Sequence, residues 1–405
     1  MLSLVFVFTA MLFVVFILSE TNAWVKYILF GLSLAIFVIG VVLCNGKISF
    51  RVDAYAFIEI LFIAFALTSS LWAMQPSDSV IMARTLFRIF ICAYMLYVTY
   101  TNVPELDEVL LLKAVMWAGY IIAIYTFAYY GFDAIVNGGH EIGLRIDNEF
   151  ANVNSIGLVC ALSCMIQINL KFLCKKYRLF PSVLFMIPGI VVIAATQSRK
   201  ALVFLLAGIM IAMLMGVMNE KGRTSAKIAK ILFELLLGAI ILLLLLQLDI
   251  FSGIRGRMYG FISSIFGGGK VDSSTILRNN LKKLGLEWFL KYPVGGIGIA
   301  NPHILAAEYY NFDAYLHDNF VELLCGGGIV GFSLYYAVYV YLFSMLWKYR
   351  RVDRNRAVFF ALWLMLMLVM DYGMVSYYSK SQGFYLMIHF VNIYHLKQKS
   401  VSYEH

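Results

Sequence analysis

The chain has 405 residues, of which 62% are hydrophobic and 14% charged, and its formal net charge is +9. Soluble domains contain about a quarter charged residues, so this composition is typical of a polytopic membrane protein and excludes soluble, disordered and disulfide-scaffold classes. Long apolar stretches recur in place of alternating ten-residue segments, which predicts an all-α helical bundle and not an outer-membrane barrel. In such a chain the placement of positive charge matters more than its sum, and we expect no nucleic-acid partner.

Stretches of about 17–25 apolar residues predict about 12 transmembrane helices. They cover residues 2–18, 24–44, 54–74, 80–100, 109–130, 153–173, 179–197, 201–218, 231–248, 319–346, 357–379 and 383–395. The first stretch lacks a basic region and a cleavage site, so we interpret it as a span and not as a signal peptide. We predict a single transmembrane domain over residues 1–405.

Basic residues in the short connections set the predicted orientation. Most of them fall on one side of the bundle, at 47–51, 171–178, 221–230, 348–356 and 397–399. By the positive-inside rule this side is cytoplasmic, so both termini are predicted to be cytoplasmic.

Two long loops then face outward, at 131–152 and 249–318. Loops of this length are usually functional or disordered, and these two are neither rich in Ser and Pro nor poor in aromatic residues. We therefore predict that the second is a large extracytoplasmic loop, folded as a cap over the active site.

Within the second loop, residues 276–289 predict an amphipathic helix. Leu277, Leu281, Leu284 and Trp288 share one face, and basic residues lie elsewhere on the helix. Such a helix is suited to the outer surface of a membrane. The stretch Pro-Val-Gly-Gly-Ile-Gly at 293–298 has no preceding strand and no lysine at phosphate-loop spacing, so it predicts a chain break and not a nucleotide site.

Three arginines stand at or inside the predicted spans. Arg84 and Arg88 are four residues apart and share a helix face. At this depth they need water, an acid or an anion, which leaves open an anionic ligand or buried pairs with Glu59 or Asp371. Arg199 begins a helix after a short outer turn, where a guanidinium beside free backbone N–H groups suits a phosphate. The alternative is that Arg199 binds no ligand and is an interfacial charge at the end of a span.

Polar residues gather at two further positions on the outer side. The first position is the segment before the span at 153–173, which contains Arg145, Asn152 and Asn154. Asn154 or Ser155 can cap that helix. Arg145, Asn152 and Asn154 could equally line a polar cavity.

At the second position His317 stands where the long loop returns to the membrane, followed by Asp318, Asn319 and Glu322. Histidine is the usual general base near neutral pH and a carboxylate can fix its tautomer, although interfacial histidines are common too.

Four motifs resemble those of the O-antigen ligase and polymerase superfamily. His-Asp-Asn-Phe at 317–320, followed by Gly-Gly-Gly-Ile-Val-Gly at 326–331, resembles the family's His-Asn and Gly-x-x-Gly signature. Ser198-Arg199-Lys200 resembles its Ser-Arg-Gly hairpin. The segment from Arg145 to Asn154 is similar to the one before its sixth span, and 292–298 to its Pro-x-x-Gly-x-Gly turn.

Two positions depart from the family pattern. Lys200 stands where the family usually has Gly, and Asp318 where it favours Asn. Both departures make the substrate subclass less certain to follow the family. Neither removes the candidate base His317 or the candidate Arg199.

The resemblance implies a glycosyltransferase embedded in the bacterial cytoplasmic membrane. Such enzymes take a glycan from an undecaprenyl pyrophosphate carrier at the outer face and invert the anomeric centre, without metal, cofactor or nucleotide sugar. Donor and acceptor are lipid-linked oligosaccharides, and a chain-length regulator and a flippase stay open as further partners. His303 and His140 lack partners at ligand spacing, so no metal site is predicted.

With the resemblance, roles can be assigned to the candidate residues. His317 is expected to be the base, with Asp318 to orient it and Glu322 as the alternative carboxylate. The leaving pyrophosphate is expected to bind Arg199 and Arg278. The remaining candidates are Arg145, Arg84 and Arg88 for the same anion or the acceptor, and Asn152, Asn154 and Asn319 for the polar cavity.

The sequence therefore predicts a polymerase that joins lipid-linked repeat units into O-antigen, capsule or exopolysaccharide. A ligase that moves finished glycan to another acceptor would share the base and arginines and differ in its acceptor cleft. A flippase would carry charge to mid-bilayer and show repeated broken helices, whereas these candidates collect at one face. A structural scaffold would tolerate loss of His317.

Overall fold

The structure is a computed structural model that describes residues 1–18, 24–140, 146, 150–174, 179–220, 224–265 and 273–404. All regular structure in these ranges is helical, which confirms the all-α class. The helices are α1 (Leu2–Leu18), α2 (Val25–Leu43), α3 (Ala54–Thr68), η1 (Ser69–Leu71), α4 (Pro76–Asn102), α5 (Glu108–Tyr130), α6 (Phe132–His140), α7 (Val153–Leu173), α8 (Leu179–Thr196), α9 (Arg199–Asn219), α10 (Thr224–Gln247), η2 (Asp249–Phe251), α11 (Ser252–Ile265), α12 (Ser273–Lys291), α13 (Pro302–Tyr310), α14 (Asn319–Lys348), α15 (Arg354–Asp371) and α16 (Lys380–Glu404).

A helix occurs in each of the twelve predicted spans. Seven helices in the described ranges are long and apolar enough to cross a membrane: α2, α3 with η1, α4, α5, α7, α9 and α14. Three boundaries differ clearly from the prediction: α10 begins at Thr224 and not at 231, α15 ends at Asp371 and not at 379, and α16 continues to Glu404 and does not end at 395. The chain is thus a multi-pass helical membrane protein, and the full set of twelve spans remains a prediction.

The chain divides into two compact units. Unit 1 consists of Met1–Leu32, Glu108–Lys270 and Arg354–Leu362, and unit 2 of Ser33–Asp107, Val271–Asp353 and Trp363–His405. The predicted loops contain helices of their own: α6 lies in the first, and α11, α12 and α13 lie in the second. The second loop is shared, since α11 belongs to unit 1 and α12 and α13 to unit 2.

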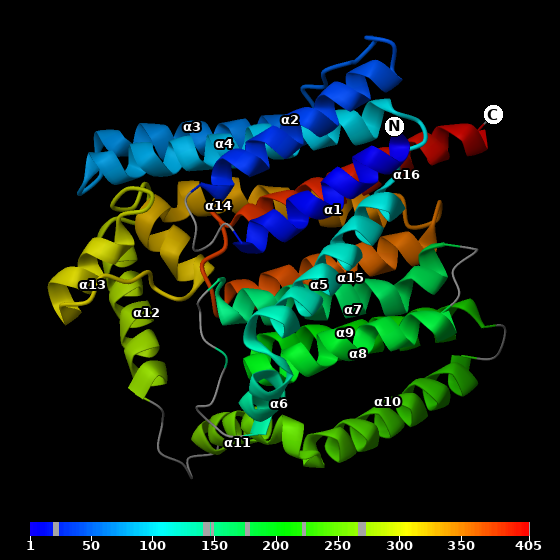
Figure 1. Ribbon diagram of the computed structural model, residues 1–405. Helices are drawn as coiled ribbons and strands as arrows, with labels where there is room; N and C mark the ends of the chain where they lie inside the picture. The colour runs from blue at the N-terminus through cyan, green and yellow to red at the C-terminus, as the bar shows by residue number, and fades with distance from the viewer. Residues whose placement is uncertain are drawn as a thin grey trace. The chain divides into compact units, whose positions relative to one another are not determined.

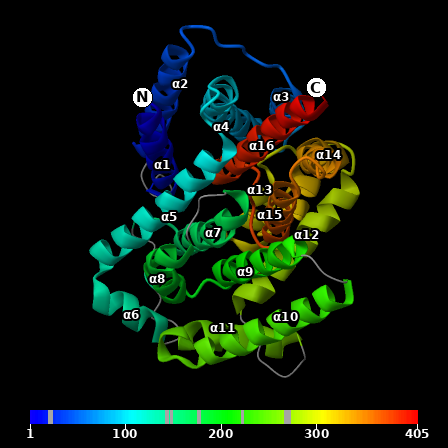
Figure 2. The ribbon, with the colours of Figure 1, turned by 90° about the vertical axis from the view of Figure 1, so that its right-hand side faces the viewer.

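Helix α7 is the centre of unit 1 and packs against α5, α8 and α9 (Figure 2). Small residues allow this close packing: a Cβ on Gly208 of α9 would lie 2.7 Å from the Met165 side chain of α7. Asn169 of α7 also donates from Nδ2 to the Gly208 carbonyl at 2.9 Å. These contacts fix α9, which begins at Arg199.

Helices α3, α4, α14 and α16 form the core of unit 2 (Figure 1). The Tyr55 ring of α3 lies 4.8 Å from the Phe390 ring of α16 and 5.9 Å from the Phe90 ring of α4, between centroids. Helix α14 approaches α3 closely because Gly331 faces Phe65, where a Cβ would lie 2.6 Å from the phenyl ring.

The predicted amphipathic helix is α12, and protein covers its apolar face. Leu281 and Leu284 are buried against Leu305 of α13 and Leu316, and the other two predicted face residues, Leu277 and Trp288, pack at the edge. The predicted face is therefore confirmed, but its partner differs from the expectation. The apolar side packs on α13 and the start of α14, so it is not free to lie on a membrane surface.

Candidate active site

A glycine-rich turn at residues 293–298 positions the start of α14. Gly296 and Gly298 have φ values of 65° and 102°, a left-handed region that glycine adopts without strain. The turn runs so close to α14 that a Cβ on Gly296 would lie 2.5 Å from the Cys325 carbonyl oxygen. That carbonyl accepts a hydrogen bond from Ile297 N at 3.0 Å. The predicted chain break is thus a tightly packed turn.

Helix α14 is broken at Gly328, where φ is 60° and ψ is −165°. A break in a helix leaves N–H groups without a helical acceptor, and the two after this break donate to the glycine-rich turn instead. Ile329 N lies 2.8 Å from the Pro293 carbonyl, and Val330 N lies 3.2 Å from the Val294 carbonyl. The turn therefore holds the first part of α14, which carries Glu322 and directly follows His317 and Asp318.

Asp318 fixes the N-terminus of α14. Its Oδ1 accepts hydrogen bonds from Phe320 N at 3.0 Å and Val321 N at 3.2 Å. Its Oδ2 lies 2.8 Å from Nζ of Lys282 on α12. Both carboxylate oxygens are thus engaged in placing the helix, and the action of Asp318 on the preceding histidine remains a prediction.

His317 has a left-handed backbone, with a φ of 58°. This conformation is uncommon for residues with a Cβ and is a form of strain that clusters at functional sites. Its neighbours Leu316 and Asp318 are both buried, which holds the strained residue in place. The imidazole is half-buried, and its centroid lies 4.3 Å from that of the Tyr315 ring.

A cavity of about 380 Å³ lies at this end of unit 2. Its polar lining consists of Asp78, His303, Asp313, Tyr315, Glu322, Tyr377 and Tyr378. His317 is not among the lining residues, but Tyr315 both lines the cavity and contacts the imidazole, so this tyrosine connects His317 to the cavity. Glu322 is 4% exposed, and its Oε2 accepts a hydrogen bond from Leu316 N at 2.8 Å.

Tyr315 also links the cavity to a predicted arginine. Burial raises the pKa of Tyr315, and the nearby positive charge of Arg278 offsets part of that rise. The phenol is therefore uncharged at neutral pH and able to donate a hydrogen bond. Arg278, on α12, is exposed. Tyr315 therefore contacts one predicted residue, His317, and is influenced by the charge of another, Arg278.

A buried network holds the segment after α15 against α14. Asn319 Oδ1 accepts hydrogen bonds from Ser376 N at 2.9 Å and Tyr377 N at 3.0 Å. Its Nδ2 donates to the Tyr336 hydroxyl at 2.9 Å. The hydroxyls of Tyr336 and Ser376 donate in turn to Asp371, at 3.0 and 2.5 Å. Asn319 thus positions the segment that supplies two tyrosines to the cavity.

One polar pair in the cavity was not predicted from the sequence. Nε2 of His303 lies 3.4 Å from Oδ2 of Asp78. Nδ1 of the same ring lies 2.8 Å from the Ala300 carbonyl oxygen, which accepts a hydrogen bond from it. The sequence shows no second metal ligand at a suitable spacing from His303. In the fold, its ring instead lies beside the Asp78 carboxylate.

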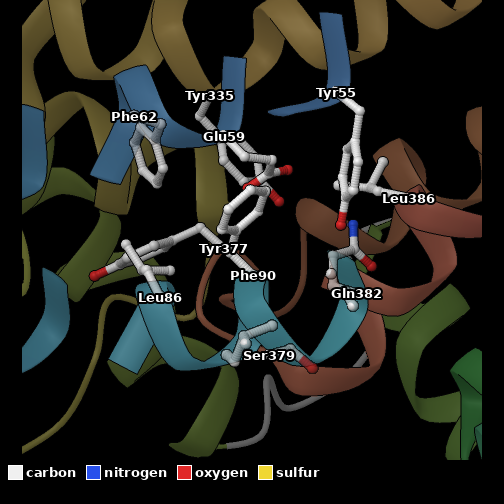
Figure 3. A pocket seen from close by; sticks show the side chains of 13 residues that line it. Tyr55, Glu59, Phe62, Leu86, Phe90, Tyr335, Tyr377, Ser379, Gln382 and Leu386 are labelled. Carbon is white, nitrogen blue, oxygen red and sulfur yellow. The ribbon is translucent and has the colours of Figure 1, made fainter. Parts of the chain in front are cut away.

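The arginines of α4 do not pair with the acids considered from the sequence. Arg84 and Arg88 are exposed, whereas Leu86 and Phe90 on another face of α4 line a small cavity around Glu59 (Figure 3). That cavity has a volume of about 20 Å³, enough for one water molecule.

The other acid, Asp371, belongs to the network with Asn319. In the described ranges neither acid forms an ion pair with Arg84 or Arg88, so the buried-pair interpretation is wrong.

The remaining predicted residues belong to unit 1. Arg199 is the first residue of α9, and the Ser198 side chain caps this helix by accepting from Ala201 N at 3.4 Å. Asn152 caps α7 by accepting from Asn154 N at 2.9 Å. The expected caps, Asn154 and Ser155, lie inside the helix instead.

Arg145 lies outside the described residues. Its expected role in phosphate binding therefore remains a prediction.

Residues 183–336 match the family model described as O-Antigen ligase. The matched stretch contains Arg199, Arg278 and His317, and the match confirms the resemblance to the O-antigen ligase and polymerase superfamily found from the motifs. The family indicates ligase-type or polymerase-type activity on lipid-linked glycans. A comparison with curated proteins finds no match.

Proposed function

We propose that this protein polymerises undecaprenyl-pyrophosphate-linked oligosaccharide repeat units at the outer face of the bacterial cytoplasmic membrane. The observation that carries the proposal is the strained His317 beside a cavity lined by acids and tyrosines. It lies within the stretch that matches the family model. The seven long apolar helices give such an enzyme its place in a membrane.

In the proposed reaction His317 removes the proton from an acceptor hydroxyl, and that oxygen attacks the anomeric carbon of the donor. The bond from this carbon to the pyrophosphate oxygen breaks, and the pyrophosphate leaves with the electron pair, so the anomeric configuration inverts. A positioned base contributes about 10²–10⁴-fold to such a step. Arg278 stabilises the charge of the leaving group. Arg199 remains a candidate for the same task, as do Arg145, Arg84 and Arg88.

A ligase is the second candidate function, because the matching family model is described as O-Antigen ligase. A ligase would use the same base and arginines and would transfer finished glycan to a different acceptor. The two functions differ in the product that accumulates when the enzyme is inactive.

The test is to delete the gene, restore wild type or His317→Asn, and measure glycan length. Single repeat units on the lipid carrier indicate a polymerase, and long chains that stay on the carrier indicate a ligase. Asn is the replacement of choice because it tolerates the left-handed backbone of His317 but is no base at neutral pH.

Glu308→Gln is the matched control, since Glu308 is an exposed residue of α13 outside the cavity lining. Its glycan should equal that of wild type. Wild-type glycan in the His317→Asn strain, with the protein present in the membrane, would contradict the proposal.

A further inference from the structure

We infer that the cavity at the start of α14 binds the acceptor sugar, and that it selects sugars that are neutral or carry an amino group over sugars that carry a carboxylate. This inference rests on the proposed function and specifies its substrate class. It concerns residues of unit 2 alone.

The charge of the lining carries the first step of the argument. Three carboxylates line the cavity, from Asp78, Asp313 and Glu322. The only histidine of the described lining, His303, lies beside Asp78, and the described residues of the lining include no lysine or arginine. The cavity is therefore net acidic. A pyrophosphate or a uronic acid would meet like charge there, whereas sugar hydroxyls and ammonium groups donate hydrogen bonds to carboxylates.

Glu322 supplies the second step. It is 4% exposed and lines the cavity, and its Oε2 accepts from Leu316 N. Its other oxygen, Oε1, has no hydrogen-bond partner among the described residues. A carboxylate oxygen that faces a cavity can accept a hydrogen bond from a donor group on a bound ligand. The Glu322 carboxylate therefore favours a ligand that donates a hydrogen bond.

The aromatic residues supply the third step. Tyr315, Tyr377 and Tyr378 line the same cavity, which gives apolar ring faces beside the acids. A sugar ring presents C–H groups on its faces and hydroxyls at its edge, which matches this mixture. The volume of about 380 Å³ lies in the range of sites that hold small molecules.

The positions of Arg278 and His317 complete the argument. His317 contacts Tyr315 and the charge of Arg278 acts on this tyrosine, whereas the acids line the cavity. A sugar in the cavity can therefore present a hydroxyl toward the base at the tyrosine wall, while Arg278, outside the lining, remains for the pyrophosphate. The acceptor is thus assigned to the cavity, and the leaving group to Arg278 outside its lining.

The inference is tested by binding of methyl glycosides to the purified full chain in nanodiscs, followed by saturation-transfer NMR. The probes are methyl N-acetylglucosaminide as the neutral sugar, methyl glucosaminide as the amino sugar, and methyl glucuronide as the acidic sugar. We expect saturation transfer to the first two and none to the third.

Two variants locate the binding. Tyr378→Ala should weaken binding of the neutral sugar about tenfold, and Tyr378→Phe should retain most of it, because the phenyl ring keeps the contact surface. Glu322→Gln should reduce discrimination against methyl glucuronide by about tenfold, since the amide is neutral. Glu308→Gln is the control and should bind as wild type does. Thermal unfolding of each variant shows whether it is folded.

Three results would overturn the inference: equal binding of methyl glucuronide, binding unchanged in folded Tyr378→Ala and Glu322→Gln, or no binding of any probe. The outcome is separable from that of the proposed function. Selective sugar binding together with normal glycan in the His317→Asn strain would reject the polymerase and keep the sugar site. The reverse combination would reject the sugar site alone.

Discussion

The Lys282 ammonium lies 2.8 Å from the Asp318 carboxylate, and this pair joins α12 to the N-terminus of α14. Lys282 also donates to the Tyr372 carbonyl at 2.8 Å and lies 3.7 Å from the centroid of the Tyr372 ring. One side chain therefore ties together three segments that surround the candidate site. The Asp318 side chain is 3% exposed and that of Lys282 is 17% exposed, so the pair is largely shielded from water.

Replacement of Lys282 by Met should destabilise unit 2 by about 2–3 kcal/mol, because Asp318 would stay buried without its counter-charge. Thermal unfolding of the purified full chain in detergent measures the effect. The double variant Lys282→Met with Asp318→Asn should recover part of the loss, since Asn also caps helices and carries no charge. A double variant as unstable as the sum of the two single variants would show that the pair contributes no coupling.

Gly296→Ala should abolish correct folding or lower stability by more than about 2 kcal/mol. The added Cβ meets the backbone of α14 at 2.5 Å, and the positive φ adds further strain. Gly46→Ala separates the two effects, because Gly46 also has a positive φ but no atom within 4 Å of its Cβ position. It should cost about 1 kcal/mol. Equal melting temperatures for the two variants would refute the close-packing account.

The glycine-rich turn and the amphipathic helix show what the sequence predicts well. Clustered glycines after 292 predicted the chain break, and leucine spacing predicted the buried face of α12, because both are local patterns. The partner of that face was missed, since a periodic pattern indicates an apolar neighbour without identifying it as protein or lipid. The spacing of apolar residues also did not show that α15 ends at Asp371. The Asp371 carboxylate accepts hydrogen bonds from Asn319, Tyr336 and Ser376, and such tertiary contacts leave no local pattern.

Asn319→Leu should release the segment that carries Tyr377 and Tyr378. The substitution leaves the backbone N–H groups of Ser376 and Tyr377 without their acceptor, at a cost of about 1–3 kcal/mol each. Hydrogen exchange at these two amides, measured by mass spectrometry on the full chain, should become faster while α3 and α4 stay protected. Unchanged exchange in a folded variant would mean that other contacts hold the segment.

Arg278→Lys should lower the polymerisation rate about tenfold, and Arg278→Ala should lower it about 10²-fold or more. Lysine keeps the positive charge but lacks the planar fork that contacts two phosphate oxygens together. Steady-state rates with lipid-linked repeat units measure both effects. A full rate in Arg278→Ala would remove this residue from the pyrophosphate role.

The candidate site was predicted in part. His317, Asp318 and Glu322 adjoin each other in sequence, so their gathering at the start of α14 follows from local structure. The pair of Asp78 and His303 joins α4 to α13 and leaves no local pattern. Pairs of this kind depend on tertiary contacts, and a single sequence carries no signal that would have found this one.

The most direct test of the central claim is the rate of glycan transfer by the purified His317→Asn variant, measured with lipid-linked repeat units as donor and acceptor. If His317 is the base, the rate should fall about 10²–10⁴-fold while the melting temperature stays close to that of wild type. A folded His317→Asn variant that transfers glycan at the wild-type rate would contradict the account.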